Sequence, residues 1–141
     1  MITAVDTNIL IDIIIGSERF RPMSVAALGR ASAQGVAVIS DIVYAEVCTA
    51  FDRREQCDEF LAEFNIKVEA LDPGSSFIAS RSWISYLGSG GKKLRILPDF
   101  LIAAHASNQA DRLLTRDHGF FKGHFPRLNV VGPIEGPAAP R

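Results

Sequence analysis

Four acidic side chains occupy positions where a charge is costly: Asp6, Glu46, Asp99 and Asp117. Asp6 and Asp117 each follow an apolar run typical of a buried strand. Glu46 and Asp99 interrupt helical faces that otherwise consist of Val, Ile, Ala and Leu. An unpaired carboxylate in such surroundings shifts its pKa and becomes neutral rather than staying charged. If the fold gathers all four, they repel one another by several kcal/mol at separations of about 4 Å. A hard divalent cation would relieve that repulsion, so the pattern predicts a metal site.

Apolar runs of strand length alternate with amphipathic segments of helix length. This alternation predicts an α/β fold with a central, mainly parallel sheet of four to five strands. Ser24 is the expected N-cap of the second helix, and Ser40 or Asp41 that of the third. We expect strands over residues 2–5, 36–39, 67–71, 112–115 and 128–131, helices over residues 9–14, 24–33, 41–53, 55–64, 75–87 and 99–109, and a short helical turn near residues 118–121.

The predicted elements would bring the four acids together. In an open parallel sheet, chemistry collects beyond the carboxyl ends of the strands, where strand order reverses. Asp6 and Asp117 lie at such ends. The helical spacing around Glu46 and Asp99 puts each of them on a stripe of apolar residues, so both carboxylates are expected to face the sheet.

Each acid also has a purely structural explanation. Asp99 could favour a helix N-terminus electrostatically, and Glu46 could form a buried salt bridge with a base. Asp6 could be a helix cap, and Asp117 could open a turn. Taken singly these explanations compete with a functional one, and it is the joint occurrence of four acids that favours a shared site.

Structural explanations are preferred for the other polar groups. Asp12 would solvate the outer face of the first helix, Asp41 would cap a helix and Asp72 would open a turn. The three histidines lack the close spacing of zinc ligands. The glycine-rich segment 88–93 lacks the residues of a phosphate-binding loop, and we expect a flexible basic loop there.

The composition is that of one globular domain. A chain of 141 residues, 48% of them apolar, can bury a sizeable core. The formal charge of −1 excludes a protein that coats nucleic acid through bulk positive charge. Two cysteines predict core thiols in a reducing, cytoplasmic compartment. The apolar segment 9–15 is interrupted by Asp12 and follows no basic stretch, so we expect neither a signal peptide nor a membrane span. We expect a domain over residues 1–131 and a flexible tail over residues 132–141.

Four ordered motifs resemble those of the PIN domain, and within it those of the VapC-type toxins. They are Asp6-Thr7-Asn8-Ile9-Leu10, Ala45-Glu46-Val47, Leu97-Pro98-Asp99-Phe100-Leu101-Ile102-Ala103-Ala104-His105-Ala106 and Leu113-Leu114-Thr115-Arg116-Asp117. The resemblance spans nearly the whole chain, with an acid at each station. It implies a three-layer α/β/α sandwich, Mg2+ or Mn2+ dependence and ribonuclease activity. It also implies homodimers and inhibition by a cognate antitoxin protein.

The resemblance also implies roles for single residues. Asp6 and Asp99 resemble principal metal ligands, and Glu46 and Asp117 resemble further ligands that act directly or through water. All four are therefore the expected catalytic residues. Two further residues match polar positions that support the metal or the scissile phosphate, namely Asn8 and Thr115. From the residues alone, Asn8 is equally a helix cap and Thr115 equally the end of a strand.

RNA must approach a negative site, so cations should flank it. Three basic residues shortly precede Asp99, namely Lys92, Lys93 and Arg95. A fourth, Arg116, is the residue before Asp117. We expect these four side chains to contact the RNA backbone. The alternative is that the first three only solvate a loop.

The expected reaction is metal-assisted hydrolysis of a phosphodiester bond, in which a metal-bound water attacks in line without a covalent enzyme intermediate. Four carboxylates suit either one or two metal ions. Two other classes stay open. An enzyme that transfers phosphate to Asp6 would want an acid where this chain has Asn8. A catalytically silent PIN-like module would bind RNA or a protein partner without cutting.

Overall fold

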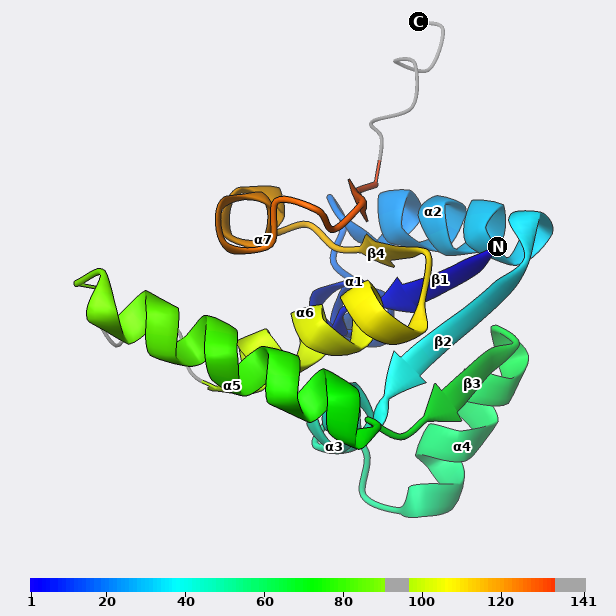
Figure 1. Ribbon diagram of the computed structural model, residues 1–141. Helices are drawn as coiled ribbons and strands as arrows, with labels where there is room; N and C mark the ends of the chain where they lie inside the picture. Colours follow the sequence, from blue (N-terminus) through cyan, green and yellow to red (C-terminus); the bar gives the residue numbers. More distant parts are fainter. Residues whose placement is uncertain (91–96, 134–141) are drawn as a thin grey trace, which may run out of the picture.

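The computed structural model describes residues 1–90 and 97–133. Within these ranges strands and helices alternate along the chain (Figure 1). They follow in the order β1 (Ile2–Val5), α1 (Thr7–Ile15), α2 (Arg21–Gln34), β2 (Val36–Ser40), α3 (Asp41–Cys48), α4 (Arg54–Glu63), β3 (Ile66–Glu69), α5 (Pro73–Gly88), α6 (Leu97–Gln109), β4 (Arg112–Leu114), α7 (His118–His124) and β5 (Val130–Val131).

The strands form one parallel sheet in the order β3-β2-β1-β4-β5. The chain builds outward from β1 through β2 to β3 and then crosses back to β4, on the other side of β1. Strand order therefore reverses at β1, and a crevice is expected beyond its carboxyl end. The predicted α/β class and parallel sheet are confirmed, and the strand bounds differ from the prediction by only a residue or two.

Helices cover both faces of the sheet, which makes the predicted three-layer sandwich. α6 packs on β1 and β4 and carries α5 on its outer side. These two helices lie in front of the sheet in Figure 1, whereas α1 and α2 lie behind it. The core between the layers includes Ile9, Leu10, Ile39, Phe100 and Leu113, all fully buried.

Two aromatic residues of α5 pack into or against this core, Tyr86 and Trp83. The rings of Trp83 and Tyr86 lie 5.2 and 5.3 Å from the ring of Phe100, measured between centroids. Such contacts add to the apolar area that each ring buries. Tyr86 is buried in the core, and Trp83 is half-buried against it.

α2 begins earlier than the sequence predicts. The expected N-cap was Ser24, but the helix begins at Arg21 with Pro22 in its first turn. Proline fits there because the first N–H groups of a helix have no partner within it. Ser24 lies inside the helix, and its hydroxyl donates to Asp12 Oδ2 at 3.1 Å. The Ser24 hydroxyl, which we expected to cap α2, instead makes a tertiary contact with α1.

The helix predicted over residues 41–53 ends early. Its N-cap is Ser40, whose Oγ accepts a hydrogen bond from the Val43 N–H at 3.2 Å. At the other end the Thr49 hydroxyl donates to the Glu46 carbonyl at 2.6 Å. The last carbonyls of a helix lack partners within it, so this contact stabilises the end of α3, and a short connection leads to α4.

Three further sequence predictions concern compartment and boundaries. None of the helices in the described ranges combines the length and the apolar composition needed to cross a bilayer. Cys48 and Cys57 are free thiols with Sγ atoms 3.4 Å apart, and Cys57 is buried, as expected of core thiols. Residues 134–141 of the predicted tail lie outside the described residues. The domain boundary at residue 131 therefore stays a prediction.

Candidate active site

Asp6 lies at the carboxyl end of the central strand, where β1 passes into α1. The residue is only 7% exposed. It is the N-cap of α1, and its Oδ1 accepts a hydrogen bond from the Thr7 N–H at 2.7 Å. Its own N–H donates to the Leu114 carbonyl at 2.9 Å, which continues the pairing of β1 with β4. Asp6 is therefore both a helix cap and a charge at the predicted end of the sheet.

The hydroxyl of Thr115 connects three polar groups around Asp6. Thr115 follows β4 and is fully buried. Its Oγ1 donates to Asp6 Oδ2 at 2.7 Å. The same oxygen accepts from Asn8 Nδ2 at 3.2 Å and from the Asp117 N–H at 3.0 Å. A hydroxyl offers one donor and two acceptor sites, so the hydrogen bonding of Thr115 is complete and its orientation is fixed.

Asn8 belongs to this network rather than capping the helix. Besides donating to Thr115, its amide accepts at Oδ1 from the Arg116 N–H at 3.3 Å. The side chain therefore joins α1 to the segment that follows β4. The structure brings the two predicted supporting residues into contact with each other beside Asp6.

Glu46 reaches the site from α3, but it is not buried. The sequence predicts that its carboxylate faces the sheet, and this is wrong because Val43 and Val47 occupy the buried stripe of α3. Glu46 is exposed, and its Oε1 accepts a hydrogen bond from the Thr7 hydroxyl at 2.7 Å. That bond keeps the carboxylate at the rim of the site, beside the residue that follows Asp6.

The pKa of Asp6 shows which other acids lie near it. Burial is the largest influence, and it raises the pKa from 3.8 to about 6 against the opposing hydrogen bonds from Thr115 and Thr7. The negative charges of Asp99 and Glu46 raise this pKa further. Asp99, in the first turn of α6, is therefore close enough to the end of β1 to act on Asp6. The structure brings three of the four predicted acids into one electrostatic neighbourhood.

Asp117 joins the site through its backbone. It is the residue before α7, its side chain makes no capping hydrogen bond to that helix, and it is half-buried. Its N–H donates to Thr115 as described above. The Thr115 hydroxyl therefore bonds both to the backbone of Asp117 and to the carboxylate of Asp6. That the Asp117 carboxylate is a metal ligand stays a prediction.

The acids do not form a preassembled coordination shell. Among residues 1–90 and 97–133, no group of three or more Asp, Glu, His or Cys side chains could hold a metal ion directly. None of the described Lys or Arg side chains forms an ion pair with Asp6. The site offers a buried carboxylate that two neighbouring acids repel. Mg2+ suits such a site because it usually keeps several waters and is bound by only one or two carboxylates.

Arg116 is anchored to the protein interior. Its Nε lies 2.7 Å and its Nη2 2.9 Å from the two carboxylate oxygens of Asp12. Asp12 is 3% exposed, so the prediction that it solvates the outer face of the first helix is wrong. The guanidinium carbon of Arg116 also lies 4.0 Å from the ring centroid of Phe20. Arg116 therefore ties the segment after β4 to α1 and to the start of α2.

Sequence reasoning did not find the pair of Asp12 with Arg116, since 104 positions separate the two residues. The one available signal was an acid in the middle of an apolar helix, which requires a partner when it is buried. The remaining RNA-contact predictions, Lys92, Lys93 and Arg95, lie outside the described residues. The structural interpretation of the histidines agrees with His105, which is buried and lies 2.9 Å from Glu69 through Nε2.

The chain belongs to the PIN domain family. The family model of the PIN domain matches residues 3–123, which include all four acids and both supporting residues. The resemblance seen in the sequence motifs is therefore confirmed. A search of curated proteins found no matching sequence.

Solved structures with a similar fold include VapBC2, a toxin–antitoxin complex and VapBC-1. VapBC2 from Rickettsia felis, bound to a DNA fragment from its promoter, contains a chain that is 23% identical, with a TM-score of 0.70 and coverage of 94% of this chain and 98% of that one. A toxin–antitoxin complex from Klebsiella pneumoniae gives 27% identity, a TM-score of 0.68 and coverages of 95% and 99%. VapBC-1 from nontypeable Haemophilus influenzae gives 23% identity, a TM-score of 0.66 and coverages of 94% of this chain and 98% of that one. These similarities confirm the PIN-like fold over almost the full length of each chain.

Proposed function

We propose that this chain is a Mg2+- or Mn2+-dependent endoribonuclease and the toxin component of a type II toxin–antitoxin system. Membership of the PIN domain family supports a nuclease at the level of class. One observation carries the proposal for this chain in particular. Asp6 is a buried carboxylate with its pKa raised to about 6, near two further acids, at the strand end where the sheet order reverses.

The acids fit a divalent ion that is held partly through water. Asp6 and Asp99 would be the principal ligands, with Glu46 and Asp117 contributing directly or through water. Carboxylate oxygens are the ligands that Mg2+ and Mn2+ prefer. When bound, such an ion would supply a hydroxide nucleophile at neutral pH and would offset the charge on the phosphate.

The residues of the chain itself would orient the reacting groups. Thr115 and the Thr7 N–H hold one carboxylate oxygen of Asp6 each. This leaves the carboxylate little rotational freedom, which is what a positioned ligand requires. Glu46 is fixed by the Thr7 hydroxyl but faces solvent. It is the acid best placed to take a proton from an attacking water and pass it to bulk solvent.

The biological setting follows from the relatives. One of the similar structures is a toxin–antitoxin complex, and we extend that arrangement to this chain. It would act on RNA in the cytoplasm, form a homodimer and be inhibited by a cognate antitoxin protein.

A catalytically silent PIN-like module that binds RNA or protein is a second candidate. It is favoured by the lack, within the described ranges, of three ligands already close enough to hold a metal. Transfer of phosphate to Asp6 is less well supported. The position two residues on is Asn8, which is fixed between Thr115 and the Arg116 N–H and supplies no acid.

The test is cleavage of a structured RNA by the purified protein with Mg2+ or Mn2+. The same reaction in EDTA, and with Asp99→Asn, should lose at least about two orders of magnitude in rate because the charge that holds the ion is gone. Glu59→Gln is the matched control. Glu59 is an exposed acid on α4, and its loss should leave the rate unchanged.

Three outcomes would contradict the proposal. Cleavage that persists both in EDTA and in Asp99→Asn would point to a contaminant or to different chemistry. RNA binding without cleavage at any ion concentration would favour the silent module. A phosphoryl group covalently attached to Asp6 would favour phosphate transfer.

A further inference from the structure

A groove rich in arginine begins beside the candidate active site and follows α2. It consists of two adjoining hollows. The first, about 450 Å³, is lined by Arg19, Phe20, Met23, Arg116, His118 and Pro133. The second, about 230 Å³, lies between the later part of α2 and the strands β1, β4 and β5. The groove starts next to Asp117 because Arg116 lines its first hollow.

The two hollows share both walls. On α2, Met23 lines the first hollow and Ala27, about one turn later, lines the second. After β5, Pro133 lines the first and Gly132 the second. From residue 23 to residue 34 an α-helix rises by roughly 16 Å. The walls therefore define an extended path rather than a site for one small ion.

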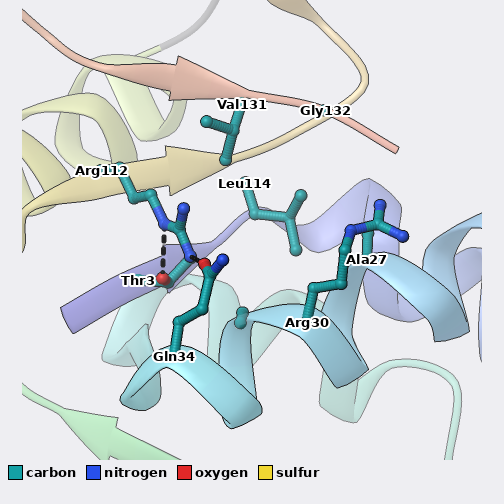
Figure 2. Close-up of a pocket in the computed structure, with 9 residues that line it drawn as sticks. Thr3, Ala27, Arg30, Gln34, Arg112, Leu114, Val131 and Gly132 are labelled. Atoms are coloured by element: carbon teal, nitrogen blue, oxygen red, sulfur yellow. Dashed lines mark hydrogen bonds between the residues drawn. The ribbon is translucent and has the colours of Figure 1, made fainter. Parts of the chain in front are cut away.

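The lining of this groove is positively charged. In the second hollow, Arg30 reaches in from α2 and Arg112 from β4, on opposite sides of the space (Figure 2). In the first, Arg19 and Arg116 lie 4.8 and 4.0 Å from the ring centroid of Phe20. Among the described residues that line either hollow there is no Asp or Glu. The formal charge of the chain is −1, so this local excess of positive charge indicates a polyanionic ligand.

The arginines differ in how much of their charge stays available. Arg116 shares its charge with Asp12. Arg112 is held by neutral groups, with its Nε donating to Thr3 Oγ1 at 2.8 Å and its Nη2 to Gln34 (Figure 2). Arg30 is exposed, and no residue of the described ranges pairs with it. The half of the groove furthest from the acids is thus the more strongly cationic.

We propose that an RNA strand leaving the candidate active site lies in this groove, with its phosphates facing Arg30, Arg112 and Arg19. This inference rests on the proposed function, because it takes the substrate to be RNA held at the acids. Guanidinium groups match phosphate geometry through paired hydrogen bonds. An aromatic ring flanked by guanidiniums is also typical of sites for single-stranded nucleic acid. An acidic protein segment could also bind the arginines of the groove, but it would give no reason for the groove to begin beside the acids of the candidate active site.

The test measures binding of a short fluorescein-labelled oligouridine by fluorescence anisotropy in EDTA. Arg30→Glu should raise the Kd by about tenfold at moderate salt, and Arg30→Ala should reduce the slope of log K against log salt by about 0.7, the value for one phosphate contact to a single strand. Lys67→Glu is the control. Lys67 is exposed on β3, at the opposite edge of the sheet from β5, and its reversal changes the net charge equally but should change the Kd less than about twofold.

Several results would overturn the assignment. If Arg30→Glu and Lys67→Glu weaken oligouridine binding equally, the weakening would come from the net charge of the protein and not from the groove. Unchanged or undetectable RNA binding would remove the groove as an RNA path. Poly-glutamate that displaces the RNA as well as unlabelled oligouridine does, at equal charge, would indicate an acidic protein segment as the occupant.

The outcome separates from that of the cleavage test. If both proposals hold, Arg30→Ala raises KM in the presence of Mg2+ and leaves kcat unchanged, because the contact is made equally in the ground and transition states. If Arg30→Ala cleaves RNA with an unchanged KM, the proposed nuclease activity would stand and the proposed RNA path along the groove would be wrong. RNA binding that depends on Arg30 in a protein that never cleaves would preserve the groove and overturn the nuclease.

Discussion

Asp6 combines two opposing contributions to stability. Its hydrogen bonds stabilise the start of α1 and the end of β1, whereas its buried charge destabilises the folded protein. Because the pKa rises from 3.8 to about 6 on folding, the folded state binds more protons than the unfolded state between these two values. The contribution of Asp6 to stability is therefore fully present below pH 3.8 and is lost as pH rises through about 6.

Asp6→Asn should stabilise the ion-free protein at neutral pH while abolishing cleavage. A shift of about two pKa units corresponds to roughly 3 kcal/mol, and the amide forfeits part of this by losing a hydrogen bond. We expect a gain of about 1–3 kcal/mol in the free energy of unfolding at about pH 7.5, and almost none near pH 4, where Asp6 is protonated in the folded wild type. Urea unfolding in EDTA at both pH values measures the difference. An equal loss of stability at both would contradict the assigned pKa.

Thr115→Val should raise the pKa of Asp6 still further and destabilise the fold. The methyl group fills the volume of the hydroxyl, but Asp6 loses a donor and the amide of Asn8 loses an acceptor. Asp6 is buried whereas Asn8 is half-exposed and can bond to water, so the cost is mainly that of one buried group that loses a partner, about 1–3 kcal/mol. Urea unfolding should show a loss in that range, and the pH profile of cleavage should move to higher pH. Thr115→Ser keeps the hydroxyl and should lie close to wild type, and a Val variant as stable as the Ser variant would contradict the central role of this oxygen.

At the scale of elements, the junction of α2 and β2 fixes where β1 begins. Gly35 lies against the start of the chain so closely that a Cβ would stand 1.9 Å from the Met1 carbonyl oxygen. The same oxygen accepts from the Val36 N–H at 2.9 Å. The close approach thus brings the first residues of β1 and β2 into register.

Gly35→Ala should therefore be destabilising, since the atom it meets is backbone and cannot move aside. We expect a loss of more than about 2 kcal/mol, the scale of other overpacking changes. Gly29→Ala is the contrasting change. Gly29 lies within α2, where an added Cβ has no neighbour within 4 Å among the described atoms, and alanine should add about 0.5–1 kcal/mol. Thermal unfolding distinguishes the two, and similar shifts for both would contradict the steric argument.

The sequence was most informative where local patterns decide the structure. The strand ends that carry Asp6 and Thr115 follow from apolar runs, and the ends of helices follow from residues such as Gly16, which adopts a left-handed φ of 68°. It was least informative where partners lie far apart in the chain. Ser24 looks like a helix cap because such a prediction cannot include Asp12, a partner on another helix. The sequence also failed to predict that Glu46 is exposed. The apolar face of a helix can be assigned from sequence only to within about one residue, and Glu46 lies beside Val47 at the edge of that face.

At the scale of the whole molecule, Asp6, Glu46 and Asp99 come from different elements that meet near the end of β1. Mg2+ should therefore raise the unfolding temperature of the wild type, because it would bind the folded state and offset the repulsion there. The shift should vanish in Asp6→Asn. The affinity for the ion should fall by about tenfold per pH unit below about 6, since ion and proton compete for Asp6. Thermal scans with and without Mg2+ across this pH range measure both effects, and an equal shift in the variant would place the ion elsewhere.

The strand order has a consequence for synthesis of the chain. β1 is made first, yet it pairs with β4, which begins at Arg112. Pairings between distant segments form slowly and late. A nascent chain that stops before β4 should show no cooperative unfolding, because its central strand has only one of its two neighbours and Asp6 lacks the hydroxyl that orients it. The ribosome that translates this protein would thus carry a polypeptide without an assembled acidic site until the segment from β4 onward has been made.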